Sequence, residues 1–224
     1  MNEESFVPGR RMLRANWILV ALAWAIALVA LPFAPDRVPT HWGVSGAPDR
    51  FAAPFPGLFL LPMIMALLAL LLPILPRIDP RKQNYRAFGS TYVAIQTGIL
   101  VFMLVLQAVT VAAALGLDIN MNRVIVPLVG VLFVGLGNVM SKIRPNWFVG
   151  FRTPWALSSP DVWTRTHRFG GRLMLGLGLV LVVAGLLFPA PITTTIVAVG
   201  ACALAALTFA YSYLVWRWLG EPHG

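Results

Sequence analysis

The sequence YVAIQTGILVFMLVLQAVTVAAAL, residues 92–115, contains no charged residue over 24 positions. The hydrocarbon core of a bilayer is about 30 Å thick, and about 20 apolar residues in a helix are enough to cross it. We therefore predict that this stretch is a transmembrane helix. Its two amide side chains, Gln96 and Gln107, are about three helical turns apart and so share one face.

Five more windows meet or approach this length, so we predict an all-α polytopic membrane protein with six transmembrane helices. The six windows are residues 17–33, 58–75, 92–115, 124–140, 173–188 and 194–216. The chain is 58% hydrophobic and 11% charged, whereas soluble domains are about one quarter charged. We expect the first window to be a retained helix, because its apolar run is longer than that of a usual signal peptide and five spans follow.

Six spans place both termini on one side of the membrane. Fourteen of the 17 Lys and Arg residues then share that side, and only Arg37, Arg50 and Arg123 lie on the other. This bias predicts cytoplasmic termini. The net charge of +9 is therefore interpreted as a signal of topology, with affinity for anionic membrane lipids, and not of direct nucleic-acid binding.

Two connecting segments are longer than turns. Residues 34–57, the proline-rich loop, contain five prolines and three glycines, which predicts a compact, turn-rich loop outside the cytoplasm. Residues 141–170, the aromatic loop, lie on the cytoplasmic side and include most of NWFVGFRTPWALSSPDVWTRTHRFGG (146–171). We expect residues 151–157 to be extended or turned because Pro154 disfavours a helical residue before it.

A helix is predicted to begin within the aromatic loop. Ser159, Pro160 and Asp161 suit the N-cap, the first helical position and an acid in the first turn. We expect an amphipathic cytoplasmic helix lying at the headgroup level, with Trp163 and His167 turned together toward the lipid. Farther on, Gly171, Gly178 and Gly185 recur every seven residues, which indicates close packing between transmembrane helices.

The proline-rich loop offers one group of candidate binding residues: His41, Trp42, Gly46 and Asp49. They could form a surface that recognises an extracellular peptide, with Trp42 as its anchor. His41 and Asp49 are also types of metal ligand, but two ligands without a third do not predict a metal site. The alternative is a tight loop that bonds to its own backbone, with Trp42 in the interfacial aromatic belt.

The aromatic loop offers a second group: Asn146, Gly150, Arg152, Trp155, Trp163 and His167. Arg152, between Trp147 and Trp155, could make cation–π contacts or bind a lipid phosphate or an acidic partner. The alternative is an anchor that fixes the helices on either side. Because Ser158 and Ser159 show no catalytic spacing with His167, we predict no catalytic residue, no cofactor and no enzymatic activity.

Two other classes of function remain open. A small transporter or lipid-handling protein would line a polar cavity with Gln96, Gln107 and Asn138, although hydrogen bonding between helices explains these residues more simply. No span contains the charged residue that an ion-coupled transporter usually needs. A membrane enzyme would use His41 or His167 on a lipid or peptide.

Three motifs in the chain are similar to the sequence patterns of a known protein family. Residues GNVMSKIRPNWFVGFRTPWALS (137–158) and WTRTHRFGG (163–171) are similar to GN-x-x-P-K-x-x-x-N-x-x-x-G-I-R-T-P-W-T-L-S followed by W-x-x-T-H-R-x-x-G. Residues PTHWGVSGAPD (39–49) are similar to P-x-H-W-N-x-x-G-x-x-D, with Gly43 in place of asparagine and Pro54 where a lysine is expected. The turn IDPRKQNY (78–85) also resembles the corresponding turn of that family. In these motifs the chain resembles the SdpI family of bacterial membrane proteins, in its longer form with an N-terminal domain of unknown function.

The resemblance implies two domains and a role in immunity. Residues 1–90 would form the domain of unknown function, with two spans, and residues 91–224 the SdpI-like domain, with four. The family's best-known member protects a toxin-producing cell from its own secreted peptide toxin and holds a repressor protein at the membrane. We therefore expect an immunity or resistance protein of the bacterial inner membrane, whose partners are a peptide toxin on the outer face and a cytoplasmic repressor on the inner face.

Overall fold

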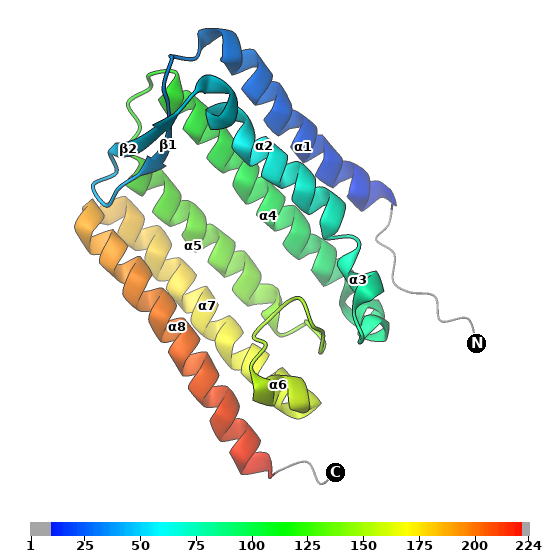
Figure 1. Ribbon diagram of the computed structural model, residues 1–224. Coiled ribbons are helices and arrows are strands. Elements are labelled where there is room, and N and C mark those ends of the chain that lie inside the picture. Colours follow the sequence, from blue (N-terminus) through cyan, green and yellow to red (C-terminus); the bar gives the residue numbers. More distant parts are fainter. Residues whose placement is uncertain (1–9, 221–224) are drawn as a thin grey trace.

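The computed structural model describes residues 10–220, which contain six long helices running side by side (Figure 1). Each is long and apolar enough to cross a membrane, so the predicted all-α, six-span architecture is confirmed. They are α1 (Arg10–Ala30), α2 (Pro54–Leu71), α4 (Tyr85–Ala114), α5 (Met121–Met140), α7 (Pro160–Leu187) and α8 (Ala190–Leu219). The terminal residues 1–9 and 221–224, to which the prediction of cytoplasmic termini also applies, lie outside the described part of the chain.

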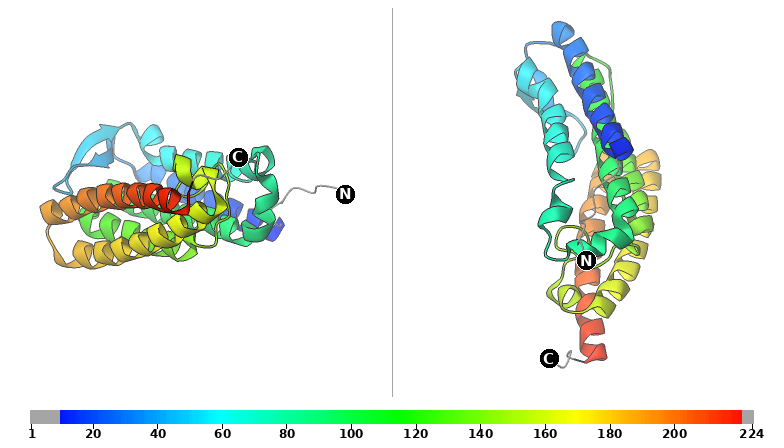
Figure 2. Two further views of the ribbon diagram at one scale, coloured as in Figure 1. Left: turned by 90° about the horizontal axis from the view of Figure 1, so that it is seen from below. Right: turned by 90° about the vertical axis from the view of Figure 1, so that its right-hand side faces the viewer.

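The short elements gather at the two ends of the bundle. One end, called the hairpin end, holds strands β1 (Val38–Trp42) and β2 (Pro48–Ala52), after the turn η1 (Leu31–Phe33). The opposite end, called the termini end, is where α1 begins and α8 finishes. It holds α3 (Leu75–Ile78), η2 (Lys82–Asn84) and α6 (Pro154–Ser158). Figure 2 shows that the bundle is elongated and that α8 extends farthest at the termini end.

The helices form two groups with separate apolar contacts. Helices α1, α2 and α4 pack around two clusters that include Ala23, Met65 and Leu100. Helices α5 and α7 pack most closely of all, because glycines remove the side chains between them. A Cβ atom added to Gly130 would lie 2.6 Å from the carbonyl oxygen of Gly178, and one added to Gly137 would lie 2.6 Å from that of Gly171. The predicted glycine packing of the fifth span is thus confirmed.

The helix predicted inside the aromatic loop begins as expected but continues much farther. Ser159 caps it by accepting a hydrogen bond from the Val162 amide, and Pro160 is its first residue. It then runs without a break through the fifth span to Leu187. The expectation of an interfacial helix lying along the headgroups was therefore wrong, because Gly170 and Gly171 do not end the helix. Gly170 packs against the Phe151 ring and Gly171 against Gly137 and Met140, and both stay helical.

Two local expectations also differ from the structure. Residues 154–158 form the short helix α6, because the proline that disfavours a helical Thr153 is itself suited to the first helical position. The proline-rich loop contains a two-stranded antiparallel hairpin, with Val38 opposite Ala52 and Trp42 opposite Pro48. Valine, threonine, tryptophan and phenylalanine favour strands, and here this preference prevails over the frequent prolines.

Candidate functional site

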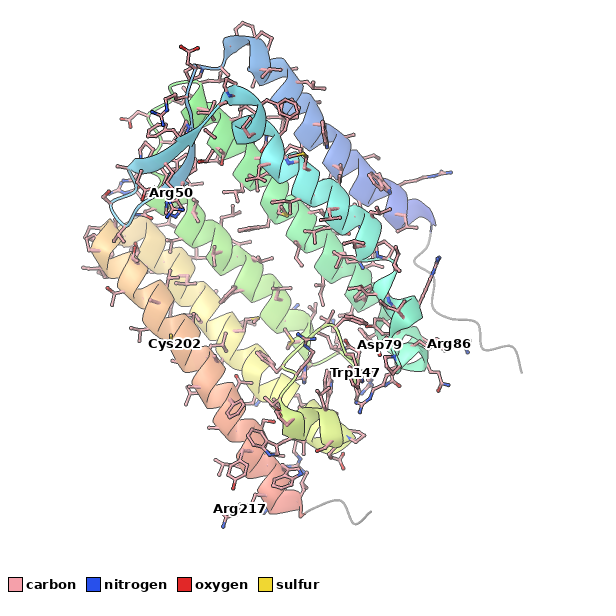
Figure 3. The ribbon with its side chains drawn as sticks, viewed as in Figure 1. Arg50, Asp79, Arg86, Trp147, Cys202 and Arg217 are labelled. Atoms are coloured by element: carbon pink, nitrogen blue, oxygen red, sulfur yellow. The ribbon has the colours of Figure 1, made fainter. Side chains whose placement is uncertain are left out.

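The hairpin brings His41 and Asp49 together. His41 Nδ1 lies 2.6 Å from Asp49 Oδ1, and the two side chains are 56% and 49% exposed. They meet because β1 and β2 are joined by a short turn, in which the Gly43 amide donates to the Ala47 carbonyl. Trp42 follows on the same strand and is half-buried. The structure therefore places three of the four predicted residues on one exposed element at the hairpin end, close to Arg50 (Figure 3).

The fourth residue, Gly46, shapes the turn that holds this element. Its φ of +82° is a left-handed conformation that glycine adopts readily and other residues rarely do. A Cβ atom there would lie 3.3 Å from Asn122 Nδ2, and Asn122 donates a hydrogen bond of 2.8 Å to the Val44 carbonyl. The turn is thereby attached to the start of α5, and Gly46 supplies the backbone conformation that this attachment requires.

At the termini end, His167 is completely buried with both ring nitrogens engaged. Nδ1 lies 2.8 Å from the Trp163 carbonyl oxygen, and Nε2 accepts the Phe151 amide hydrogen at 2.9 Å. A carbonyl partner requires a proton on Nδ1, and an amide partner requires a lone pair on Nε2, so the ring is neutral. The ring also stacks on the indole of Trp163, with centroids 4.0 Å apart. Trp163 and His167 therefore face protein and not lipid, contrary to the expectation.

Gly150 lies directly against this histidine. Its φ is +114°, and a Cβ atom added to it would collide with His167 Nε2. The glycine therefore allows the backbone of the aromatic loop to pass close to the ring and to present the next amide, that of Phe151. The indole nitrogen of Trp163 completes the attachment by donating to the Ile143 carbonyl at 2.9 Å.

Asn146 closes the loop on itself. Its side-chain oxygen accepts the amide hydrogens of Phe148 and Val149 at 2.9 and 2.7 Å, and its amide group donates to the carbonyls of Arg144 and Val149. The side chain is fully buried. Four of its five hydrogen bonds are made within the loop, and the fifth comes from the Tyr85 hydroxyl at 3.4 Å, so Asn146 has the geometry of a structural clamp.

Asp79, a buried carboxylate at the centre of this region, is not among the residues predicted from the sequence. Its Oδ2 accepts the hydroxyl of Tyr85 and the amide of Trp147, both at 2.9 Å, while Oδ1 accepts the Arg81 amide at 2.7 Å. Figure 3 shows Asp79 and Trp147 close together at the termini end. The only signal in the sequence was that the turn IDPRKQNY resembles a family motif. That resemblance gave no role to Asp79.

Further bonds attach the aromatic loop to its surroundings. Asn84 donates to the Pro145 carbonyl and Arg81 to the Leu157 carbonyl, both at 2.7 Å. On the other side the Thr153 and Ser212 hydroxyls are 2.5 Å apart, and Trp155 packs edge-on against Phe209 of α8. The aromatic loop thus joins the first helix group to α7 and α8, as in the anchoring alternative.

Arg152 and Trp147 are both exposed in this region. The Arg152 guanidinium donates a 2.5 Å hydrogen bond to the Trp147 carbonyl, where a cation–π contact with the flanking indoles was considered. The two serines considered as nucleophiles have local roles, since Ser159 caps α7 and Ser158 donates to the Trp155 carbonyl. With His167 neutral and fully bonded, this geometry suits structural support and does not assemble a nucleophile with a base.

The polar residues of the spans do not line one polar cavity. Gln107 donates to the Leu58 carbonyl at 2.9 Å, which is the expected hydrogen bond between helices. Gln96 is almost completely buried, whereas Asn138 is exposed near the termini end of α5. A crevice of about 440 Å³ between α4 and α5 has an apolar lining apart from Asn138. The arrangement expected for a polar transport path is therefore not present among these three residues.

Comparison with known protein families agrees with the resemblance of the sequence motifs. Residues 142–212 match the SdpI/YfhL protein family, and residues 18–66 match a domain of unknown function, DUF1648. The chain is thus similar to the SdpI/YfhL family in its C-terminal part and to the domain of unknown function before it, which confirms the resemblance seen in the sequence. The hairpin lies within the second matched region, and residues 142–170 of the aromatic loop lie within the first.

Three curated proteins are similar to the chain. The immunity protein SdpI of Bacillus subtilis (strain 168) is 24% identical over 74% of this chain and 77% of its own length. An uncharacterized protein of Archaeoglobus fulgidus is 44% identical over 20% of this chain and 25% of its own length. The uncharacterized membrane protein YbgB of Bacillus subtilis is 28% identical over 40% of this chain and 89% of its own length. No solved structure matches the chain.

Proposed function

We propose that this multi-pass membrane protein is a non-enzymatic immunity protein that protects a bacterial cell from a membrane-active peptide toxin. The observation that carries the proposal is the similarity to an immunity protein over three quarters of the chain. We place the protein in the cytoplasmic membrane with both termini inside, on the basis of its 14 to 3 distribution of cations. The hairpin end then faces outward, toward a secreted peptide.

The hairpin supplies the chemistry for recognising a peptide. His41 and Asp49 are half-exposed and form a pair that can exchange hydrogen bonds with a peptide backbone, and Trp42 adds apolar contact area beside them. The bond from Asn122 to the turn fixes this surface relative to α5. A surface held in place before binding loses less conformational entropy when a partner docks.

The aromatic loop supplies a rigid platform for a second partner on the opposite face. Arg152 and Trp147 are exposed on a loop whose other members are clamped by Asp79, Asn146 and His167. Arginine and tryptophan are enriched among residues that dominate protein interfaces. We assign to this platform the capture of a cytoplasmic repressor, so that toxin binding on one face is reported on the other.

A toxin-challenge assay tests the immunity role. A sensitive host expressing the chain should survive the secreted peptide toxin that the family's best-known member resists, whereas the same host with an empty vector should not. Trp42→Ala should reduce survival at least tenfold, and Asp36→Ala, an exposed acid just before the hairpin, should leave it unchanged. Equal killing of hosts with and without the wild-type chain, at verified membrane levels, would reject the proposal.

A further inference from the structure

Three arginines form a cationic face on α7. Arg165, Arg168 and Arg172 are three and four residues apart, so they lie on the same side of the helix, and all three are exposed. Trp163 and His167 occupy the opposite, buried side. No hydrogen bond or ion pair to these guanidinium groups occurs among residues 10–220, and the partner of Arg165 there is the ring of Trp218, 5.1 Å away. The charges of Arg168 and Arg172 are thus left without a protein counter-charge in this part of the chain.

Two hollows share Arg168 and Arg172. The larger, of about 510 Å³, opens toward α8 and includes Arg165 and Tyr211, but also the carboxylate of Asp161. The smaller, of about 310 Å³, lies between α5 and α7, and Arg168 and Arg172 are the only charged side chains in its lining. Asn138 and Ser141 add an amide and a hydroxyl there. The smaller hollow is therefore the better place for an anion, since no acid repels it.

The length of α7 sets the depth of these arginines in the bilayer. Its 28 residues span about 42 Å at 1.5 Å per residue, which exceeds the hydrocarbon thickness of about 30 Å. The same face carries the exposed side chains of Leu179, Val183 and Leu186 farther along, which are suited to contact lipid tails. With that part in the hydrocarbon, Arg165 and Arg168 lie at its edge, and Arg172 reaches the edge by extending its side chain.

We infer that Arg168 and Arg172, together with Asn138 and Ser141, bind the phosphate of an anionic phospholipid at the termini end of α5 and α7. Two guanidinium groups give planar, bidentate donors to phosphate oxygens, and the polar side chains of α5 complete the coordination. Asn138 also lines the apolar crevice between α4 and α5. An acyl chain attached to the bound phosphate can therefore follow α5 past the exposed Val131 into that crevice.

Lipid retention by the purified full chain tests the site. Wild-type protein in a neutral detergent, titrated with equal amounts of phosphatidylglycerol and phosphatidylcholine, should retain phosphatidylglycerol preferentially in native mass spectra. Arg168→Gln with Arg172→Gln should weaken that retention about 10- to 30-fold, the size expected for two cations near a membrane surface. The matched control is Arg77→Gln with Arg217→Gln, which removes two exposed cations outside both hollows and should retain the lipid as the wild type does.

Three results would overturn the inference. The first is equal retention of the two lipids by the wild type. The second is an equal loss of phosphatidylglycerol retention in both double variants, which would mean that the overall positive charge, and not this site, holds the lipid. The third is displacement of phosphatidylglycerol by glycerol phosphate at the same concentration, which would identify a soluble phosphate compound as the ligand. Unchanged elution volume and melting temperature confirm that each variant is folded.

Discussion

At the scale of the residue, the most consequential side chain is the buried carboxylate of Asp79. It accepts hydrogen bonds from three donors that come from two separate segments of the chain. Replacement by alanine removes the acceptor of the part-buried Trp147 amide and leaves the buried Tyr85 hydroxyl with only its longer bond of 3.4 Å to Asn146. The loss of a hydrogen-bond partner costs about 1–3 kcal/mol for a buried group, so we expect Asp79→Ala to lower the free energy of unfolding by roughly 3 kcal/mol.

The melting temperature of the purified protein, followed by tryptophan fluorescence, measures this effect. The matched control is Asp118→Ala, which removes an exposed acid from the connection between α4 and α5 and should change little. A melting temperature for Asp79→Ala equal to that of the control would mean that the aromatic loop does not depend on this carboxylate.

Gly150 gives a second prediction at this scale. Alanine there must adopt a positive φ and also displace the His167 ring, so the bond from the Phe151 amide to Nε2 is lost. We expect Gly150→Ala to make the aromatic loop accessible to limited proteolysis while the six long helices keep their circular dichroism. Gly176→Ala, at an exposed glycine with open space around it, is the control that should remain resistant. Equal cleavage of the two variants would contradict the role given to Gly150.

These residues show what sequence could and could not predict. Asn146, Gly150, Trp163 and His167 were all identified as candidates, because a familial motif singles them out by type and spacing. Their orientation was predicted wrongly for Trp163 and His167, since whether a helix face meets lipid or protein depends on the loop that folds back over it. Asp79 was missed because its partners are the Trp147 amide, 68 residues away, and a hydroxyl whose burial no local pattern reveals.

At the scale of the element, the contact of α5 with α7 is the tightest in the bundle. It depends on glycines on both helices, and periodicity predicted this packing because glycines spaced seven apart lie on one face of a helix. The hairpin was not predicted, since its strands are only five residues long and each contains a proline. The start of α7 was predicted by its cap, but not its continuity with the span, because a Gly-Gly pair can equally end a helix.

Gly178→Val tests the α5–α7 contact. A Cβ atom there would lie 2.6 Å from the Gly130 carbonyl oxygen, so the two helices must separate. Overpacking of this kind costs about 1–3 kcal/mol or more, and we expect a lower melting temperature by several degrees. Gly176→Val places the same side chain on the same helix where nothing lies within 4 Å, so it controls for helix propensity. Equal melting temperatures for the two variants would show that the glycine contact does not limit stability.

At the scale of the whole molecule, the two candidate regions lie at opposite ends of a bundle of six membrane-length helices (Figure 1). Helix α5 alone separates the Asn122 contact with the hairpin from the aromatic loop by 20 residues, or about 30 Å. A signal between them must therefore pass through packed helices. Helix α5 connects the two regions directly, and its glycine contact with α7 joins it to the helix that holds His167.

The orientation of this bundle is the prediction on which the proposed roles of both regions depend. The reverse orientation would require 14 Lys and Arg residues to be transferred across the membrane, which is unfavourable. We therefore expect the hairpin outside the cell and the aromatic loop inside. In a Cys202→Ser background, Ser45→Cys places a thiol at the exposed hairpin turn and Ser158→Cys places one at the exposed end of α6. A membrane-impermeant maleimide should label the first in intact cells and the second only after permeabilisation. Labelling of both thiols in intact cells, or of neither, would place the two regions in one compartment and would remove the basis for toxin recognition on one face and repressor binding on the other.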